Sequence, residues 1–400
     1  MPSDAAGLRF PFHSPHPLEP PREHATLRAT QPVAKAILPG GAPVWLVTRY
    51  EDVRKVFTDP RLSRQAITAP DALKIFPVAV PGLKTIAVMD PPEHTRIRKL
   101  VAKTFTMRQM ERLRPRVEEL AEQMISKLAA EGPPADLIAH VAEPLPITVI
   151  CELLGVPQQA RPQFLDWTDV MFGYTARPVE EIRAASTKLR AYFAELVANK
   201  QQQPADDLLT MLITARDEDN SLSTEELLTF GETMLLAGHH STTAAIAHAV
   251  LNLASQPGQT ARLAAHPELL PAAIEELLRF ATAGSGISSI RIATEEIELG
   301  GVTIRPGEAV LPCLNSANHD ENVFDQPEQL RLDRKHNPHL AFGHGIHHCI
   351  GAHLARVELQ VVLERLMHHL GEFDLAIAVD ELSWRTGITF FWPHILPLRW

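Results

Sequence analysis

The chain has 400 residues, more than the roughly 250–300 at which one hydrophobic core usually stops growing, so length alone suggests two domains or one unusually large one. Hydrophobic residues make up 45% and charged residues 22% of the sequence, a balance typical of globular proteins that excludes disordered and fibrous classes. The formal net charge of −10 disfavours nucleic acid as the main partner, because binding phosphates needs a concentrated positive field.

Membrane insertion and secretion are also disfavoured. The most apolar windows are shorter than the ~20 residues needed to cross a bilayer or contain a charge. The first ten residues lack the basic and apolar regions of a secretory signal, and Cys151, Cys313 and Cys349 are too few and scattered for a disulfide framework. We therefore expect no membrane partner and a cytoplasmic location.

The first 21 residues carry six prolines, so this stretch should be extended rather than helical. We expect residues 1–45 to form an N-terminal arm packed on the rest of the molecule. Apolar residues at spacings of three and four then predict helices over residues 53–57, 110–128, 147–154 and 182–197. Because no repeat or low-complexity linker divides the chain, we expect one domain over residues 1–400.

A basic segment lies between residues 96 and 116, where Glu111 is the one acidic residue. It forms either a solvated helical face or a docking surface for an acidic partner or an anionic cofactor. Its basic residues are Arg96, Arg98, Lys99, Lys103, Arg108, Arg112, Arg114 and Arg116.

The longest predicted helix begins after Ser223, where Glu226 completes a reciprocal capping box, and continues to about Ser255. Its middle, residues 237–243, contains Gly238 and three hydroxyl side chains where a regular helix favours Leu, Glu or Lys. We therefore predict a kink there.

The pattern changes near residue 287. Alternating residues 297–299 and 302–304 flank Gly300-Gly301, which predicts a two-residue β-hairpin. Further strands are predicted over residues 309–314, 373–378 and 388–392. The expected fold class is mainly α, an α+β protein with a large helical region and a small β-rich region.

A cysteine loop carries the sharpest chemical pattern, Phe342-Gly343-His344-Gly345-Ile346-His347-His348-Cys349-Ile350-Gly351. The glycines permit a tight loop, and the apolar spacing that follows predicts a helix whose positive N-terminal end stabilises the Cys349 thiolate as a soft metal ligand. Gly351 would let a flat group approach closely. Taken alone, the pattern also fits a buried structural cysteine or a zinc site made by His344, His347, His348 and Cys349.

The order of these residues resembles the haem-binding loop of the cytochrome P450 family. The resemblance implies the P450 fold around a buried haem b, with the Cys349 thiolate as axial ligand of the iron and Phe342 shielding the sulfur. Gly343 and Gly351 belong to the same haem-binding loop. The implied protein is a bacterial haem-thiolate monooxygenase that takes electrons from a ferredoxin and its reductase.

Four further residues match the family's ligands of the haem propionates: His94, Arg98, Arg291 and His347. By themselves they would be read as surface charges, but cationic donors are the expected partners of two carboxylates. The resemblance also places the basic segment on the proximal side, where an acidic ferredoxin docks.

Glu276 and Arg279 alone would be an ordinary ion pair three residues apart on a helix. Beside the cysteine loop they look like the family's Glu-x-x-Arg pair, which ties its helix to the segment containing Asp333, Arg334 and Asn337. The implied role is structural.

The predicted kink departs from the family pattern. Ala237 and Gly238 match it as haem-facing residues, but the usual acid is His240 and the usual threonine is Ser241. A hydroxyl donor is retained, with Thr242 beside it, and an imidazole can relay protons, so Ser241, His240 and Thr242 are the candidate catalytic residues. Ordinary oxygen activation, leaky turnover that releases peroxide, and oxidative coupling all remain open.

Matched by position to the family, the substrate pocket is largely apolar. It suits a small-molecule substrate, a medium-sized apolar natural product such as a terpenoid, steroid or polyketide. Its candidate residues are Trp167, Met171, Phe172, Leu235, Gly284, Ile287, Phe390 and Phe391. The alternatives to a monooxygenase are a peroxide-driven or coupling oxidase on the same fold, a zinc hydrolase using the His/Cys cluster, and a noncatalytic haem sensor.

Overall fold

The computed structural model describes residues 8–400 apart from 13, 15, 70–83, 103, 173–176, 220–221, 282, 285 and 386–388. The chain divides into two compact units. Unit 1 comprises Met1–Leu83 and Glu275–Cys349, and unit 2 comprises Lys84–Ile274 and Ile350–Trp400. The prediction of one domain over residues 1–400 stays a prediction.

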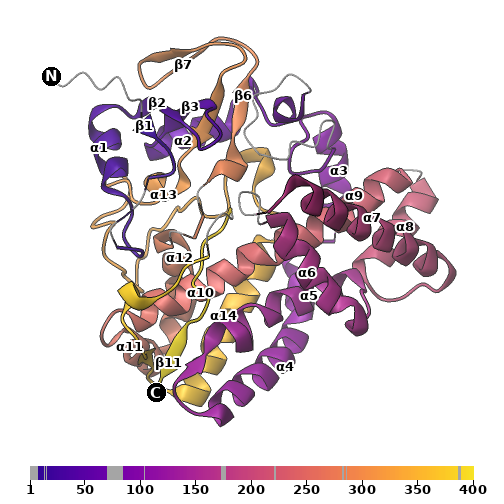
Figure 1. The fold of residues 1–400 in the computed structure, drawn as a ribbon, viewed down its shortest axis with the longest axis vertical. Coiled ribbons are helices and arrows are strands. Elements are labelled where there is room, and N and C mark those ends of the chain that lie inside the picture. The colour runs from indigo at the N-terminus through magenta and orange to yellow at the C-terminus, as the bar shows by residue number, and fades with distance from the viewer. Residues whose placement is uncertain are drawn as a thin grey trace. The chain divides into compact units, whose positions relative to one another are not determined.

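Unit 1 is built on a six-stranded mixed sheet (Figure 1). Alternate residues of its central strands face two separate apolar clusters, with Val33, Val47 and Val310 in one and Leu46 and Leu311 in the other. Both faces of the sheet are therefore buried. In spatial order the strands are β1 (Leu8–Arg9), β2 (Val33–Ile37), β3 (Pro43–Val47), β9 (Ala309–Pro312), β6 (Arg291–Ala293) and β4 (Leu62–Ser63).

The expected N-terminal arm over residues 1–45 holds more regular structure than a simple extended arm. No helix occurs in the described residues before Pro21, but α1 (Arg22–Thr30) starts directly after it, and β2 and most of β3 follow. Residues 33–37 contain no proline and pair with β3, whose Pro43 lies at the strand end, so these residues contribute to both sheet faces.

The remaining elements of unit 1 include the predicted hairpin, in which β7 (Ile297–Leu299) pairs with β8 (Val302–Ile304). Gly300 and Gly301 have φ of 56° and 81°, as a turn with two left-handed residues requires. Helix α2 (Tyr50–Thr58) contains the helix predicted over residues 53–57, and α13 (Leu314–Ala317) follows β9. The hairpin prediction is confirmed.

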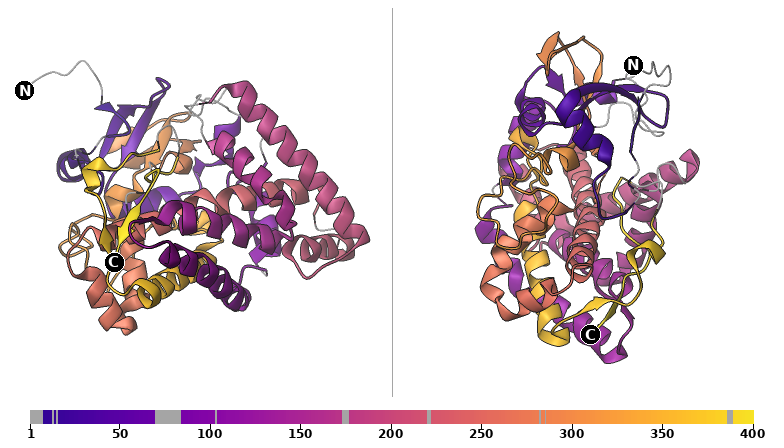
Figure 2. Two further views of the ribbon diagram at one scale, coloured as in Figure 1. Left: turned by 60° about the horizontal axis from the view of Figure 1, so that its bottom comes forward. Right: turned by 90° about the vertical axis from the view of Figure 1, so that its left-hand side faces the viewer.

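Unit 2 is mainly helical (Figures 1 and 2). Helix α10 contacts α14, which in turn packs along α4, while α7 packs against α6 and α9. The predicted helices over residues 110–128, 147–154 and 182–197 fall within α4, α5 and α7. The helices lying wholly in unit 2 are α3 (Glu93–Ala102), α4 (Met107–Glu131), α5 (Pro144–Leu154), α6 (Arg161–Phe172), α7 (Val179–Gln202), α8 (Leu208–Asp219), α9 (Thr224–Gly238), α10 (His240–Ala254), α11 (Gln259–Ala265) and α14 (Ala352–Leu370).

The long central helix is broken where the sequence predicts a kink. The predicted capping box is present at its start, where Ser223 and Glu226 exchange side-chain and backbone hydrogen bonds. Helix α9 ends at Gly238 and α10 begins at His240, because His239 has a non-helical ψ of −84°. Both the cap and the kink are confirmed.

A small antiparallel sheet completes unit 2, in which β11 (Pro397–Arg399) lies between β10 (Asp374–Leu375) and β5 (Ala135–Asp136). The strand predicted over residues 388–392 is wrong for residues 389–392, which form no strand; residue 388 lies outside the described residues. The Phe391 carbonyl accepts a hydrogen bond from His248 Nε2 at 2.8 Å, so this backbone group contacts α10 instead of a neighbouring strand.

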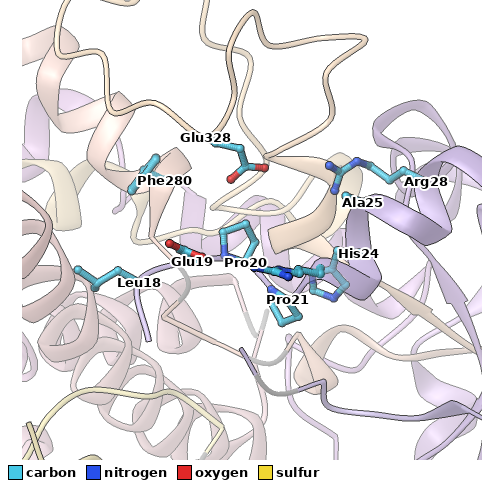
Figure 3. Close-up of a pocket in the computed structure, with 10 residues that line it drawn as sticks. Leu18, Glu19, Pro20, Pro21, His24, Ala25, Arg28, Phe280 and Glu328 are labelled. Carbon is cyan, nitrogen blue, oxygen red and sulfur yellow. The ribbon is translucent and has the colours of Figure 1, made fainter. Parts of the chain in front are cut away.

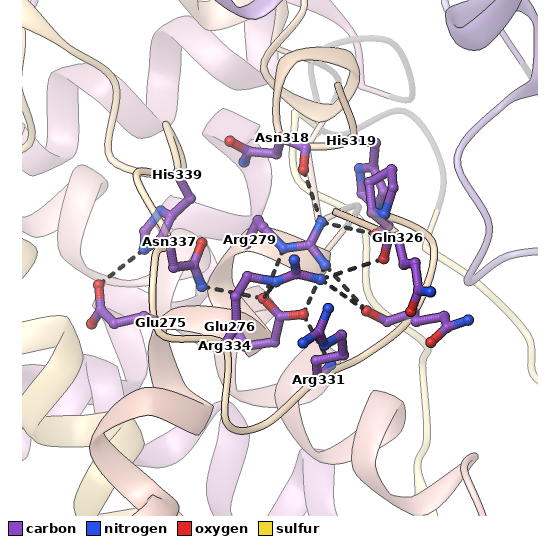
Figure 4. A network of polar contacts seen from close by, with 12 residues as sticks. Glu275, Glu276, Arg279, Asn318, His319, Gln326, Arg331, Arg334, Asn337 and His339 are labelled. Carbon is purple, nitrogen blue, oxygen red and sulfur yellow. Dashed lines mark hydrogen bonds and ion pairs between the residues drawn. The ribbon is translucent and has the colours of Figure 1, made fainter. Parts of the chain in front are cut away.

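A buried polar network surrounds Glu276 on α12 (Leu270–Phe280), the helix through which the chain passes from unit 2 into unit 1 (Figure 4). Arg279 donates two 2.8 Å bonds to the Glu276 carboxylate, and Arg334 Nε donates a third at 2.8 Å. Asn337 and the backbone N–H of Arg331 donate at 3.2 and 3.0 Å. The Glu276 and Arg279 side chains have 0% exposure, so the carboxylate balances two guanidinium groups away from water.

We predict that Glu276→Gln destabilises the protein by about 3–5 kcal/mol, because it leaves two buried guanidinium groups without a counter-charge. Urea denaturation monitored by circular dichroism measures the effect. The control is Arg331→Gln, since the Arg331 side chain pairs with the exposed Asp325 and should contribute less than about 1 kcal/mol. Equal losses in the two variants would contradict this account.

Glu358 on α14 is a second fully buried carboxyl group, with a different environment. It is 2% exposed, and its Oε2 has no hydrogen-bond partner within the described residues. Burial raises the pKa of Glu358 to about 8, so the folded protein holds this group neutral at pH 7.

Glu358 should make stability fall as pH rises from about 4.5 to 8, since the unfolded chain loses this proton in that window while the folded chain keeps it. Glu358→Gln removes this dependence on pH. We predict that the free energy of unfolding of the variant exceeds that of the wild type by an amount that grows across this pH range, reaching on the order of 1–3 kcal/mol. Denaturation midpoints at pH 5, 6.5 and 8 test this, with Glu372→Gln, exposed just beyond α14, as the control. A difference that stays constant with pH would rule out a buried neutral Glu358.

Candidate functional site

The cysteine loop at the end of unit 1 is closed by its own backbone. Gly343 N–H donates to Leu340 O at 2.8 Å, and Cys349 N–H donates to Phe342 O at 2.9 Å. Gly343 and Gly345 have φ of 71° and 68°, values that disfavour any other residue. This tight loop leaves Cys349 exposed.

The loop packs closely against α2. A Cβ atom on Gly345 would lie 2.6 Å from Phe57 O, so this approach requires glycine. The Arg291 guanidinium lies over the Phe57 ring, 4.4 Å from its centroid, and Arg291 Nη1 donates to Ser289 O at 2.7 Å. Phe57 thus joins the cysteine loop to Arg291. Sequence analysis missed this residue because, within an amphipathic helix, it has the pattern of an ordinary core position.

Cys349 lies just before α14 rather than in its first turn, since the helix begins at Ala352 after the N-cap Gly351. The predicted buried face is present, with Leu354, Val357 and Val361 at 6%, 2% and 0% exposure. The chain therefore passes from the cysteine directly into a helix anchored in the unit 2 core.

The four predicted propionate ligands divide between the units. Arg291 and His347 lie in unit 1 with Cys349, while His94 and Arg98 lie one turn apart on α3 in unit 2. His94 is 2% exposed, and burial, reinforced by the charge of Arg98, lowers its pKa. A neutral imidazole beside a guanidinium can donate hydrogen bonds to a carboxylate.

The kink brings together the candidate catalytic residues. Ser241 Oγ donates to Ala237 O at 2.6 Å, so the hydroxyl hydrogen is used within the helix and the oxygen remains available as an acceptor. Thr242 is buried at 5% exposure, and its N–H donates to His239 O at 3.1 Å. Gly238 lies against Ile150, whose side chain would be 3.0 Å from an added Cβ.

His240 has a charged partner that sequence analysis did not identify. Its Nε2 lies 2.7 Å from Asp169 Oδ1, and Arg385 Nη1 lies 3.7 Å from the other oxygen of Asp169. Asp169 lies between the predicted pocket residues Trp167 and Met171. No local pattern distinguishes it there from a solvated acid, because its partners are distant in sequence.

The predicted pocket residues lie in different environments, and their role in lining the substrate pocket stays a prediction. Trp167 packs edge-on against Phe164, with ring centroids 5.4 Å apart, whereas Leu235 has 0% exposure and lies wholly in the core. The Gly284 carbonyl accepts a bond from Asn315, and Ile287 packs against the sheet. Half-buried positions are occupied by Met171, Phe390 and Phe391, and the Phe172 side chain lies outside the described residues.

Several arginines of the basic segment already form ion pairs with glutamates. Arg96 pairs with Glu226, Arg114 with Glu111 at 2.7 Å, and Arg116 with Glu152 at 2.8 Å. Among the described residues of the basic segment, three exposed cations form no ion pair: Lys99, Arg108 and Arg112. Lys103 lies outside those residues.

Two competing locations for a site receive no support. Within the described part of the chain, no group of three or more His, Cys, Asp or Glu side chains is placed to hold a metal ion, so the zinc alternative lacks a ligand cluster there. A cavity of about 280 Å³ in unit 1 is lined by Leu18, His24, Arg28, Phe280 and Glu328 among others (Figure 3), and contains none of the predicted site residues.

The residues present fit a haem. The loop exposes a thiolate-forming side chain on a backbone shaped by glycines in the left-handed region, and a soft sulfur ligand suits haem iron. Within unit 1, Arg291 and His347 are side chains of the kind that bind carboxylates. When bound, the haem would supply the binding and activation of dioxygen.

The described residues include no helix that is both long and apolar enough to span a membrane.

Comparison with known proteins identifies the family. The cytochrome P450 family model matches residues 146–378. The chain is 43% identical to nocardicin C N-oxygenase of Nocardia uniformis subsp. tsuyamanensis and 42% identical to mycinamicin IV hydroxylase/epoxidase of Micromonospora griseorubida; each match covers 98% of both chains. The crystal structure of HinD with NMFT and NO superposes with a TM-score of 0.93 at 42% identity, covering 99% of this chain and 100% of that one. The chain therefore belongs to the cytochrome P450 family, the haem b monooxygenases whose iron carries a cysteine thiolate.

Proposed function

We propose that this P450 inserts one oxygen atom from O₂ into a medium-sized apolar natural product, by hydroxylation or epoxidation of a terpenoid, steroid or polyketide-like compound in the cytoplasm. The observation that carries the proposal is the cysteine loop, which exposes Cys349 on a glycine-shaped backbone and packs on Phe57, whose ring contacts Arg291. Relatives named for N-oxygenation and for hydroxylation and epoxidation of natural products support the reaction type.

In this proposal Cys349 is the axial ligand, and Phe342, Gly343 and Gly351 shape its loop. His94, Arg98, Arg291 and His347 hold the propionates, while Ala237 and Gly238 face the haem. At the kink, the Ser241 oxygen can accept a hydrogen bond because its hydrogen is donated to Ala237 O. Thr242, the next residue, is the second candidate hydroxyl.

We predict that the reduced protein under carbon monoxide shows the long-wavelength Soret band of a thiolate-ligated haem, and that Cys349→Ala loses it because the only sulfur on the loop is removed. Absorption spectra of the reconstituted proteins measure this. Cys313→Ala is the matched control, since Cys313 is buried in the sheet cluster and burial raises its thiol pKa to about 12. Retention of the band in Cys349→Ala would show that the loop has been misassigned.

We also propose that a ferredoxin, reduced by its reductase, supplies the electrons and docks on Lys99, Arg108 and Arg112. These three side chains are exposed, whereas neighbouring arginines are already paired with glutamates of the same unit. Unpaired surface cations attract an acidic partner over distances of about a Debye length.

Reversing the charge at Lys99 or Arg112 should slow electron transfer from an acidic ferredoxin about tenfold at low ionic strength, with little effect on substrate affinity. Stopped-flow reduction rates and substrate titrations measure the two quantities separately. Arg183→Glu, an exposed position on α7, serves as the control. Unchanged reduction rates in the Lys99 and Arg112 variants would place the docking surface elsewhere.

A second candidate is oxidative coupling or peroxide-driven oxidation, which the His240-Ser241 pair favours because it replaces the family's usual acid and threonine. Product formation from hydrogen peroxide without electron donors distinguishes a peroxide-driven enzyme from a monooxygenase. Lack of any product with a bound, reducible haem would point instead to a sensor.

A further inference from the structure

Two adjacent residues at the kink contact two adjacent residues of α6. His239 Nδ1 lies 3.1 Å from Thr168 Oγ1, and His240 Nε2 lies 2.7 Å from Asp169 Oδ1. The break between α9 and α10 is therefore held at two neighbouring points by one helix. One histidine contacts a hydroxyl and the other a carboxylate, so the two imidazoles have different chemistry.

His239 is fixed in a neutral state. Thr168 Oγ1 donates its hydrogen to Leu165 O at 3.1 Å, so it can only accept from His239, which places the imidazole proton on Nδ1. Burial, together with the charge of His240, holds the pKa of His239 well below its usual value. His239 therefore positions the kink and has little capacity to move protons.

His240 instead faces an ionised group. Burial opposes ionisation of Asp169, but the hydrogen bond and charge of His240, with the charge of Arg385, outweigh it, and the pKa of Asp169 is lowered. The Asp169 side chain is 45% exposed while that of His240 is 3% exposed. A half-exposed carboxylate thus holds an imidazole that is itself largely buried.

The other groups around this pair keep it in place. Arg385 forms an ion pair with Glu143 and lies over the Trp392 ring, 4.9 Å from its centroid, while the His240 ring lies 5.4 Å from the same indole. Burial raises the pKa of Glu143 against the opposing charge of Arg385. Asp169 and Glu143 together balance the cationic Arg385 beside His240.

We infer that Asp169 and His240 form a proton-donating pair. The imidazole of His240 lies at the kink and is the donor, and the carboxylate of Asp169, on α6, positions it. The family's usual arrangement, by the resemblance described above, puts the carboxylate on the kink itself. The inference rests on the proposed monooxygenase function, since it concerns proton supply to the same site.

The step is a single proton transfer. Asp169 accepts a hydrogen bond from Nε2–H of His240, so the second nitrogen, the buried Nδ1, is the one that gains and loses a proton. The His240 imidazolium gives the Nδ1 proton to a water molecule at the kink, the N–H bonding pair stays on nitrogen, and the ring becomes the neutral Nε2–H imidazole. Water returns a proton to Nδ1, while Asp169 remains ionised and stabilises the cationic form.

The decisive test is a double-mutant cycle on the complete enzyme with its electron donors. We expect Asp169→Asn and His240→Gln each to lower the share of consumed electrons that appears in product about tenfold, the lost electrons appearing as peroxide. If Asp169 acts through His240, the double variant should be no worse than His240→Gln alone. Asp166→Asn, an exposed acid on the same helix, is the matched control and should couple normally.

Two rescues separate this role from a merely structural one. Hydrogen peroxide brings two protons with the oxygen, so peroxide-driven product formation should fall less in the two single variants than electron-driven coupling does. Exchanging the two groups, His240→Asp with Asp169→His, should recover coupling relative to either single variant. Normal coupling in Asp169→Asn, or additive losses in the double variant, would overturn the inference.

The pairing can also be measured without turnover. Nitrogen-15 NMR of histidine-labelled protein, with the His240 signal assigned by its loss in His240→Gln, should show the Nε2–H tautomer in the wild type. Asp169→Leu, which removes the acceptor, should abolish this preference. A wild-type protein with the proton fixed on Nδ1 would contradict the pairing, whereas a haem-loaded wild type without turnover would contradict the proposed function instead.

Discussion

The hydrogen-bond network around the buried Glu276 carboxylate holds the segment that precedes the cysteine loop. The carboxylate accepts bonds from Arg279 and Arg334 and from the backbone N–H of Arg331, so one side chain fixes a helix and the irregular segment that leads towards the loop. Irregular backbone has few regular hydrogen bonds of its own, and a buried charge with satisfied partners specifies its path more narrowly than apolar packing would. Arg279 also donates to the carbonyls of Asn318 and Pro327, which fixes the backbone before that segment as well.

The loop itself shows how a backbone can be shaped for one exposed side chain. Gly343 and Gly345 adopt left-handed conformations, and Gly345 approaches the Phe57 carbonyl so closely that no side chain fits. Phe57 then contacts Arg291 through its ring. Loop, helix α2 and strand β6 are thus joined through one aromatic residue, and the position of Arg291 follows from the same packing that positions the cysteine.

Periodicity and turn chemistry were enough to predict the local structure. The capping box of Ser223 and Glu226, the Gly300-Gly301 hairpin and the kink near His239 each depend on neighbouring residues, and all are present. The contacts that give the candidate site its character are not local. Asp169 meets His240 across 71 positions of sequence, and Phe57 meets Arg291 across still more, so no spacing rule identifies them. The strand expected near residue 390 failed for a related reason, since the Phe391 carbonyl is engaged by the distant His248.

Partners, rather than burial alone, decide which buried groups of this chain are charged. Glu276 and Glu358 are equally buried, yet one faces two guanidinium groups while the other has burial as its dominant influence and is held neutral. The adjacent histidines of the kink also differ in their partners, because His239 contacts the Thr168 hydroxyl while His240 contacts the Asp169 carboxylate. If His240 supplies protons as proposed, the carboxylate contributed by α6 is the counter-charge that its protonated form needs.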